Sequence, residues 1–326
     1  MRAVVCKEFG PPESLVVEEI ESPELGAGQV RIAVEACGVN FPDTLIIENK
    51  YQFKPPLPFS PGGEVAGSIV EVGSDVEGYD VGDRVIAMTG WGGFAQEVLS
   101  APQQLMRIPD GMDAITAAGF TMTYGTSHYA LKQRAALRPG ETVLVLGAAG
   151  GVGLAAVDIA VAMGAKVIAA ASTQEKLDLC REYGAESCIN YTEENLKDRV
   201  KELTGGVGVD VVYDPVGGEL FEQALRATAW GGRVLVIGFA SGKIPQLPAN
   251  LVLLKSCQVV GVFWGAFTAR DPETNTANLA ELAAWHREGK IRPLVSQTYP
   301  LERAGEALRS LLERRATGKV ILTTGD

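Results

Sequence analysis

Short apolar segments, separated by Pro and Gly clusters such as Pro55-Pro56 and Pro61-Gly62-Gly63, fill the first hundred residues. Their β-branched, partly alternating composition predicts strands, and strands punctuated so often are typical of a barrel or sandwich. The predicted strands are Arg2–Lys7, Leu15–Glu21, Val30–Cys37, Glu64–Val72, Asp83–Met88 and Phe94–Leu99.

The hydrophobic pattern changes near residue 142, where apolar β-branched runs alternate with helical patterns. Such alternation indicates βαβ units and a parallel sheet. The predicted strands are Thr142–Leu146, Lys166–Ala171, Ser187–Ile189, Val209–Asp214 and Arg233–Phe239, with an apolar edge strand at Gln258–Trp264. The predicted helices are Gly153–Met163, Glu175–Tyr183, Asn195–Leu203 and Leu220–Ala227.

The last part of the chain returns to a mixed pattern, with helices at Leu279–Glu288 and Glu302–Arg314 and strands at Val295–Tyr299 and Lys319–Thr323. The simplest layout is an α/β protein in which one domain is inserted into another. We expect a β-rich domain over residues 1–122, completed by 290–326, and a doubly wound α/β domain over 123–289.

The composition of the chain argues against several classes of binding partner. The formal net charge of −11 over 326 residues disfavours nucleic acid and anionic membranes as partners. The most apolar stretch, between Thr142 and Ala171, is interrupted by Asp158 and Lys166 and does not predict a membrane span. With no apolar leader at the N-terminus, we expect a soluble cytoplasmic protein that acts on a small molecule. Five cysteines without a C-x-x-C pair support neither a disulfide framework nor a thiolate zinc site.

A glycine-rich turn, Val143-Leu-Val-Leu-Gly147-Ala-Ala-Gly150-Gly151-Val-Gly153, lies between a predicted strand and a predicted helix. This is the context of a dinucleotide-binding turn, in which Gly150 lets the backbone approach pyrophosphate and Gly153 lets the helix pack on the strand. Ala148 stands where the strict motif has its first Gly. The competing interpretation is an ordinary tight turn, which the surrounding βαβ units disfavour.

The end of the next strand indicates which nicotinamide cofactor binds. An NAD site expects a carboxylate there for the ribose 2′-hydroxyl. This strand ends Ala169-Ala170-Ala171-Ser172-Thr173, without one. Ser172, Lys176 and Tyr191 instead predict a cradle for the 2′-phosphate of NADPH. The alternative for Lys176 is a solvated helix lysine.

These motifs together resemble the zinc-independent quinone oxidoreductases of the medium-chain dehydrogenase/reductase superfamily, which includes zeta-crystallin. The resemblance covers nearly the whole chain. It rests on A-A-G-G-V-G at 148–153, S-T-x-E-K at 172–176, N-Y at 190–191, G-V-N-F-P-D at 38–43, P-G-G-E-V-A-G at 61–67, Y-D-V-G-D-R-V at 79–85 and T-G-K-V at 317–320.

The resemblance implies a GroES-like β-barrel catalytic domain, a Rossmann cofactor domain, an active site in the cleft between them, and a homodimer through the Rossmann sheet edge. It also places Asn40, Gly63 and a residue near Ala118 where zinc alcohol dehydrogenases have Cys, His and Cys. These residues are poor zinc ligands. The two histidines, His128 and His286, are more readily explained as surface or packing residues, so we predict no metal.

Without a metal, reduction of a conjugated carbonyl such as a quinone is the favoured chemistry, because the nicotinamide supplies hydride and the protein mainly positions the reactants. The predicted catalytic residues are Asn40, which could fix the nicotinamide ribose or the substrate carbonyl, and Tyr51, a possible proton donor. Asn40 could equally cap a helix, and Tyr51 could anchor its loop. Further predicted cofactor contacts are Thr123, Thr126, Ala149, Gly150, Gly151, Val152, Ser172, Lys176, Tyr191, Gly238, Phe239, Phe263, Trp264 and Lys319.

Two other functions stay open. The same scaffold could reduce enones, either alkenals or enoyl thioesters. It could also bind NADPH without catalysis, as the resemblance to a lens crystallin allows.

Overall fold

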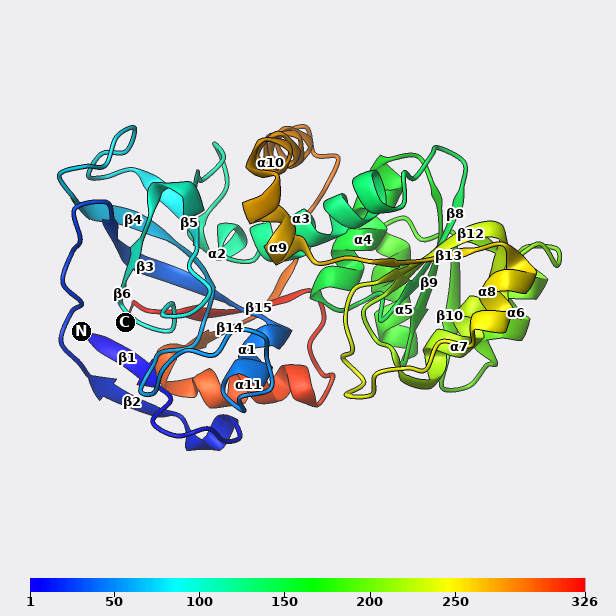
Figure 1. Ribbon diagram of the computed structural model, residues 1–326, viewed down its shortest axis with the longest axis horizontal. Coiled ribbons are helices and arrows are strands. Elements are labelled where there is room, and N and C mark those ends of the chain that lie inside the picture. The colour runs from blue at the N-terminus through cyan, green and yellow to red at the C-terminus, as the bar shows by residue number, and fades with distance from the viewer. Residues whose placement is uncertain (326) are drawn as a thin grey trace. The chain divides into compact units, whose positions relative to one another are not determined.

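The computed structural model describes residues 1–325, which form two compact units (Figure 1). Unit 1 combines Met1–Thr121 with the segment from Pro293 to the C-terminus, and unit 2 spans Met122–Arg292. The chain therefore leaves unit 1 once, builds unit 2 and returns. Within the described residues, no helix has the length and apolar character needed to cross a membrane.

Unit 1 is built on a seven-stranded sheet in which β6 also pairs with β3. Register shifts in the pairing of β3 with β4 mark bulges, which bend and twist a sheet. A separate hairpin, β1–β2, flanks the sheet. The sheet runs β14 (Val295–Pro300), β15 (Lys319–Thr323), β3 (Val30–Val39), β4 (Glu64–Val72), β5 (Arg84–Met88) and β7 (Leu105–Arg107), with β6 at Glu97–Ser100; the hairpin is β1 (Arg2–Val5) and β2 (Val16–Glu19).

The core of unit 1 contains alternate side chains of β3 and β4 together with one face of helix α11 (Ala304–Leu312). Ala304, Ala307 and Leu308 are buried at i, i+3 and i+4, the spacing of one helix face. Short helices α1 (Phe41–Ile46) and α2 (Ala114–Ala117) follow the strands closely. Helix α1 matters most for function, because it fixes the residues at the end of β3.

Unit 2 has a six-stranded, wholly parallel sheet in the order β10-β9-β8-β11-β12-β13. The chain moves outward from β8 through β9 to β10, then crosses back to β11, so strand order reverses between β8 and β11. Ligands of such sheets bind outside the carboxyl ends of the strands at this point. The strands are β8 (Thr142–Leu146), β9 (Lys166–Ala171), β10 (Ser187–Asn190), β11 (Val209–Asp214), β12 (Thr228–Val236) and β13 (Gln258–Gly261).

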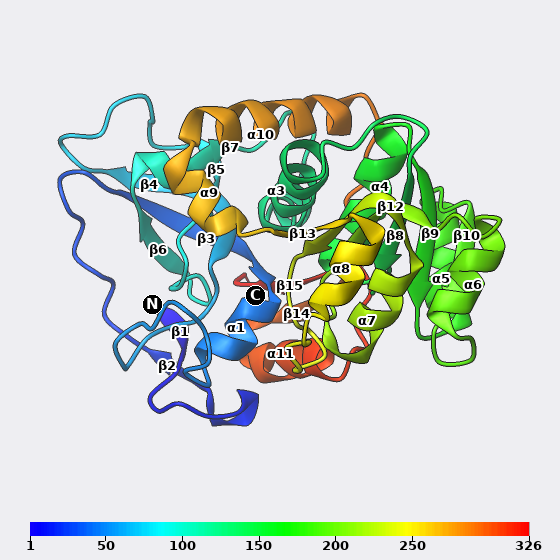
Figure 2. The same ribbon diagram turned by 45° about the vertical axis from the view of Figure 1, so that its right-hand side comes forward.

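Helices flank this sheet, as Figure 2 shows: α4 (Gly151–Ala162), α5 (Gln174–Glu182), α6 (Leu196–Leu203), α7 (Gly218–Ala227) and α8 (Ala249–Lys255). Helices α9 (Trp264–Arg270) and α10 (Pro272–Arg287) instead contact the segment that begins with α3 (Thr121–Tyr129). The predicted fold class, a GroES-like β domain with an inserted Rossmann domain, is confirmed.

Helix α4 is tied to α3 by two buried contacts one helical turn apart. Ser127 donates to the carbonyl of Val152 at 3.0 Å and bonds the Tyr213 hydroxyl at 2.9 Å. Tyr124 donates to Asp158 at 2.8 Å, and the same carboxylate accepts from the backbone N–H of Arg292 at 2.6 Å. The first turn of α4 is thereby held from α3 and from the central strand β11.

The structure corrects three predicted element bounds. Strand β13 ends at Gly261 because its partner β12 ends at Val236, directly opposite, so Phe263 lies beyond the strand and Trp264 begins α9. Gly238 and Phe239 accordingly lie in a loop rather than in β12. Helix α10 starts at Pro272, seven positions before the predicted Leu279, because Asp271 accepts from the N–H of Thr274 and Pro272 suits the first turn.

A bidentate ion pair stabilises the start of the parallel sheet. Both guanidinium Nη atoms of Arg233 donate to the Glu141 carboxylate, at 3.0 and 2.8 Å, and Arg138 adds a backbone N–H at 2.9 Å. Burial by itself would raise the pKa of Glu141. The hydrogen bonds from Arg233 and Arg138 outweigh it and lower the pKa to about 2.

This pair predicts acid sensitivity. Because the folded-state pKa lies below the ordinary 4.5, the stabilisation is complete above pH 4.5 and is lost as pH falls toward 2. Full deprotonation contributes on the order of 3 kcal/mol. In urea titrations, the stability gap between the parent and Glu141→Gln should shrink by about 1 kcal/mol from pH 7 to pH 3.5. A gap that is independent of pH would contradict this.

Candidate functional site

The turn between β8 and α4 is a candidate site within unit 2. Gly147 takes φ +57°, a left-handed conformation that favours glycine. A Cβ on Gly153 would lie 2.2 Å from the Gly147 carbonyl oxygen, so only glycine fits there. A Cβ on Gly150 would meet nothing closer than 3.4 Å, so this residue is not demanded by packing within the protein. A ligand that approaches the backbone would explain a glycine at this position.

The N-terminus of α4 begins directly at this turn. Gly150 is the N-cap and has no side chain to satisfy the first N–H groups of the helix, from Gly151 onward. Such groups, together with the helix dipole, bind anions. Ala149 is buried and Gly151 and Val152 are partly exposed at the start of the helix. The turn therefore has the form of a phosphate cradle at the point where strand order reverses.

The loops after β9 and β10 lie together at the same edge of the sheet. Tyr191 donates its backbone N–H to Ala171 at 3.2 Å, and Thr192 donates its hydroxyl to the Ser172 carbonyl at 3.3 Å. Thr173 caps α5 by accepting from the N–H of Lys176, which places Lys176 in the first turn. The structure thus brings Ser172, Lys176 and Tyr191 to neighbouring strand ends, with no carboxylate at the end of β9.

These features fit a dinucleotide that carries a 2′-phosphate. The close approach at Gly153 lets α4 begin directly at the glycine turn. Residues 169–173 at the end of β9 carry no charged side chain, and Lys176 follows in the first turn of α5. The end of β9 therefore lacks the carboxylate that would favour a free 2′-hydroxyl.

The other predicted contacts of unit 2 lie in varied surroundings. Gly238 and Phe239 follow β12, where the Phe239 ring packs near Gly217, and Phe263 is about half exposed. Thr123 is buried in α3 and Thr126 is partly exposed. Trp264 is buried against Gly125 of α3 and donates its indole N–H to Asn275 at 3.1 Å. Trp264 thereby joins α9 to α3 and α10, and the cofactor contacts of all six residues stay predictions.

The two histidines also lie in unit 2. The side chain of His128 is fully buried, with its Nε2 atom 2.7 Å from Glu281, so it is a packing residue rather than a surface one. Burial lowers the pKa of His128, which favours the neutral ring. His286 is partly buried on α10.

A buried polar ring forms a second candidate site, within unit 1. Lys319, the first residue of β15, donates its ammonium group to Asn40 Oδ1 at 2.7 Å and to Glu64 Oε2 at 3.1 Å. Asn40 Nδ2 donates to the same Glu64 oxygen at 3.0 Å and to the Gly38 carbonyl at 3.3 Å. The sequence predicts a cofactor contact for Lys319, whereas its recorded partners here all belong to unit 1.

Asn40 stands at the N-cap of α1, but its side chain does not cap the helix. Asp43 supplies that interaction by accepting from the Asn40 backbone N–H at 2.7 Å. Burial raises the pKa of Asp43 to about 7, against the opposing effects of the Asn40 N–H and the Lys319 charge. Asn40 is consequently held at both its backbone and its carboxamide.

Tyr51 is half-buried in the loop after α1 and packs against the core of unit 1, with its ring centroid 5.8 Å from that of Phe53. Burial, with a smaller effect of the Asp43 charge, raises the pKa of the Tyr51 phenol. The hydroxyl therefore stays protonated at neutral pH. It can donate a hydrogen bond, while the ring anchors the loop.

The residues of this region do not fit zinc. Where a zinc site would need a thiolate or imidazole, Asn40 offers a carboxamide oxygen that already accepts from an ammonium group, and Gly63 offers no side chain. Across residues 1–325, no three His, Cys, Asp or Glu side chains are grouped so that they could hold a metal ion.

Sequence reasoning missed the roles of Glu64, Asp43, Ser127 and Tyr213. Glu64 and Asp43 appear only as letters of family motifs, and nothing local marks them as partners of Asn40 and Lys319. Ser127 and Tyr213 are 86 positions apart, and only the fold brings their hydroxyls together. Glu64 stands directly before the apolar residues Val65 and Ala66 at the start of β4, and this is the one signal that could have been followed.

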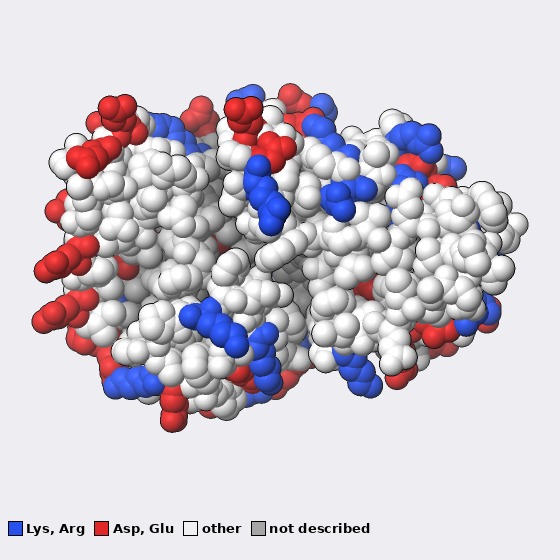
Figure 3. Space-filling view, in the orientation of Figure 1, with Lys and Arg blue, Asp and Glu red and all other residues white. Residues whose placement is uncertain are grey.

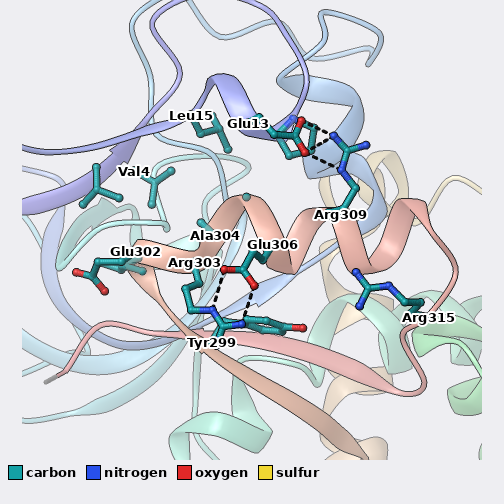
Figure 4. A pocket seen from close by; sticks show the side chains of 14 residues that line it. Val4, Glu13, Leu15, Tyr299, Glu302, Arg303, Ala304, Glu306, Arg309 and Arg315 are labelled. Carbon is teal, nitrogen blue, oxygen red and sulfur yellow. Dashed lines mark hydrogen bonds and ion pairs between the residues drawn. The ribbon is translucent and has the colours of Figure 1, made fainter.

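A groove of about 480 Å³ lies elsewhere in unit 1, between helix α11 and the segment that contains the short 3-10 helix η1 (Pro12–Ser14) and strand β2 (Figure 4). Its charged side chains are already paired, as Arg309 is with Glu13, Arg303 with Glu306 and Arg315 with Glu313. The groove therefore offers no uncompensated charge to a ligand.

Comparison with known proteins agrees with this geometry. Residues 26–110 match the model of the alcohol dehydrogenase GroES-like domain, and residues 151–284 match that of the zinc-binding dehydrogenase. The quinone oxidoreductase-like protein 2 homolog of Nematostella vectensis is 47% identical, over 99% of this chain and 89% of the relative.

Two solved structures are also similar. The Escherichia coli quinone oxidoreductase complexed with NADPH superposes with a TM-score of 0.92 at 31% identity, over 99% of this chain and all of that one. The CurK enoyl reductase superposes with a TM-score of 0.88 at 27% identity, over 99% of both chains. The two-unit fold, the glycine turn and these relatives together show that the chain belongs to the quinone oxidoreductase-like family of the medium-chain dehydrogenase/reductase superfamily.

Proposed function

We propose that this protein is an NADPH-dependent oxidoreductase that reduces quinones by hydride transfer. The observation that carries the proposal is the edge of unit 2 where the glycine turn and Ser172, Lys176 and Tyr191 lie at neighbouring strand ends. The NADPH complex of the Escherichia coli quinone oxidoreductase supports the choice of cofactor. The name of the Nematostella relative supports the quinone.

The protein would hold NADPH through the backbone of residues 149–152 at its pyrophosphate and through Ser172, Lys176 and Tyr191 at its 2′-phosphate. When bound, NADPH supplies a hydride, and a proton from solvent completes the conversion of quinone to hydroquinone. The residues of the chain then only need to bind and orient the reactants. No residue has to supply a proton, because the oxyanion produced from a quinone is a stabilised phenolate.

The hydrogen bonds of Asn40 define what it offers to a ligand. Both hydrogens on Nδ2 are donated within unit 1, whereas Oδ1 accepts one bond and retains a second lone pair. Asn40 can therefore accept from a hydroxyl group, such as that of the nicotinamide ribose, but cannot polarise a substrate carbonyl. Of the two predicted catalytic residues, Tyr51 is the one that can still donate a proton.

A second candidate is the reduction of enones, either alkenals or enoyl thioesters. The similarity to the CurK enoyl reductase and the protonated Tyr51 phenol favour it. A third possibility, NADPH binding without catalysis, belongs to a different class. Oxidation of NADPH with any acceptor excludes it, so a steady-state assay with quinones, alkenals and enoyl thioesters is the first experiment.

We also propose a homodimer through the free edge of the unit 2 sheet. Strand β13 is the last strand of that sheet, and the neighbouring apolar side chains of Trp230, Leu253 and Leu254 are each more than two-thirds exposed. Figure 3 shows a largely uncharged surface over α8. Exposed apolar edges of this kind are normally covered. The cytoplasmic location stays a prediction from the sequence.

The role of Tyr51 can be tested with one substitution. Tyr51→Phe should leave quinone turnover within about twofold of the parent, because no committed acid is needed. If Tyr51 protonates an enone-derived intermediate, the same change should lower enone turnover by about 10²-fold. Tyr79→Phe, which removes a hydroxyl bonded to Leu105 elsewhere in unit 1, serves as the control. No loss with either acceptor would assign Tyr51 to loop anchoring, because Phe keeps the ring. Equal losses with both acceptors would contradict a role specific to enones.

Cofactor preference depends on Lys176. Lys176→Ala should weaken NADPH binding by about tenfold or more and leave NADH nearly unchanged, since a charge-assisted contact contributes about 1.5–3 kcal/mol. Dissociation constants from fluorescence titration measure this. Lys197→Ala on α6 controls for the change in net charge. Equal affinities of the parent for the two cofactors would contradict the assignment.

The dimer predicts a mass near twice the 34.5 kDa of one chain in sedimentation equilibrium. The double variant Leu253→Asp/Leu254→Asp should shift the protein to monomer, because two carboxylates would be buried without partners. Val81→Asp, at an exposed apolar residue of unit 1, should leave the mass unchanged. A monomeric parent at micromolar concentration would refute the dimer.

A further inference from the structure

Unit 1 buries an ion pair between Glu64 and Lys319 that the sequence does not predict. The side chain of Glu64 is 0% exposed and that of Lys319 is 7% exposed, with 3.1 Å between Oε2 and Nζ. Removing two charges from water costs several kcal/mol each, so a buried pair is weak evidence for stability. Fixing the conformation of a neighbouring group is a better explanation for such a pair.

The neighbouring group is the carboxamide of Asn40. A single oxygen, Glu64 Oε2, accepts from both Lys319 and Asn40, while Lys319 also donates to Asn40 Oδ1. The three side chains form a closed ring of three hydrogen bonds. Tight packing encloses it, because a Cβ on Gly38 would lie 2.7 Å from Glu64 Oε2 and one on Gly119 would lie 3.1 Å from the Lys319 side chain.

The ring permits only one orientation of the carboxamide. An ammonium group can only donate and a carboxylate can only accept, so Oδ1 must face Lys319 and Nδ2 must face Glu64. A flipped carboxamide would set its NH₂ against the ammonium and its oxygen against the carboxylate, which replaces two hydrogen bonds by two repulsions. The second hydrogen of Nδ2 is taken by the Gly38 carbonyl.

We propose that Glu64 and Lys319 are positioning residues that hold Asn40 as a pure hydrogen-bond acceptor for a ligand hydroxyl group. The inference rests on the proposed function, which it deepens. A ribose of NADPH and the hydroquinone product both present such a hydroxyl. In either case Glu64 and Lys319 act through Asn40 and do not touch the ligand.

The test variant is Glu64→Met/Lys319→Met, which removes both charges together and frees the carboxamide to rotate. The matched control is Glu64→Gln, whose single amide oxygen can still accept from both Lys319 and Asn40. Affinity for NADPH is measured beside affinity for adenosine 2′,5′-bisphosphate, which lacks the nicotinamide ribose. Inhibition by hydroquinone is measured beside inhibition by its dimethyl ether, which has no hydroxyl.

If the hydroxyl belongs to the cofactor, the double variant should bind NADPH about three- to tenfold more weakly, the effect of one lost hydrogen bond. Its affinity for adenosine 2′,5′-bisphosphate should not change. If the hydroxyl belongs to hydroquinone, the loss should appear in hydroquinone inhibition and not in that of the dimethyl ether. In both cases Glu64→Gln should stay within twofold of the parent, and adding Asn40→Leu to the double variant should cost less than a further twofold.

The proposal is overturned if the double variant matches the parent with every ligand, or if it loses affinity equally for ligands with and without the hydroxyl. Should the double variant not fold, hydrogen exchange of the Asn40 carboxamide in the parent, assigned by its loss in Asn40→Leu, decides. Exchange at least 100-fold slower than that of an exposed Asn supports the ring, and exchange at the exposed rate refutes it. A parent that neither binds nor oxidises NADPH would refute the proposed function itself.

Discussion

The close approach of helix α4 to the end of strand β8 is the constraint on which unit 2 depends. With no side chain at Gly153, the first turn of α4 lies against the carbonyl of Gly147, and the helix N-terminus points to the edge where strand order reverses. The form of the phosphate cradle at this turn follows from that placement, because the N–H groups and the dipole act only over the first turn. Ser127 and Tyr213 fix the same turn from behind through the Val152 carbonyl.

Unit 1 obeys a different constraint, the need to satisfy polar groups that its sheet buries. Asn40, Asp43, Glu64 and Lys319 lie where β3, β4 and β15 begin or end, and each is 6% exposed or less. Their charges and dipoles are paired with one another rather than with solvent. The arrangement fixes which atom of the Asn40 carboxamide remains available to a ligand. The hydrogen bonds already made by the side chain, and not the residue type alone, therefore decide what Asn40 can bind.

Local patterns predicted the fold well where they were strong. The bounds of β8, β9, β11 and β15 follow from short β-branched runs that end in glycine, polar or charged residues. Predictions failed where tertiary pairing decides. The sequence predicts a strand that begins at Arg233, whereas β12 begins at Thr228 and includes Trp230-Gly231-Gly232, because a register shift against β11 absorbs the extra residues. Strand β13 ends where its partner β12 ends, and the sequence of β13 alone gives no information about the length of β12.

The candidate sites also differ in whether local sequence or tertiary pairing brings their residues together. The residues of the glycine turn follow one another closely in the sequence, and so do those of the Ser172–Lys176 segment. Their spacing alone therefore predicts their function. The pairing of Glu64 with Lys319 spans 255 positions and leaves no local signal.

The hydrogen-bond pattern of that pairing also changes the interpretation of Asn40. From the sequence, its amide could either donate to a carbonyl or accept from a ribose. Once Lys319 and Glu64 are placed, the donor hydrogens are committed and only acceptance remains. Under the proposed function, a substrate that requires its carbonyl to be polarised would depend on Tyr51, whereas a quinone would not. The hydrogen bonds of Asn40 therefore support the proposal of a quinone over an acceptor that needs a proton donor.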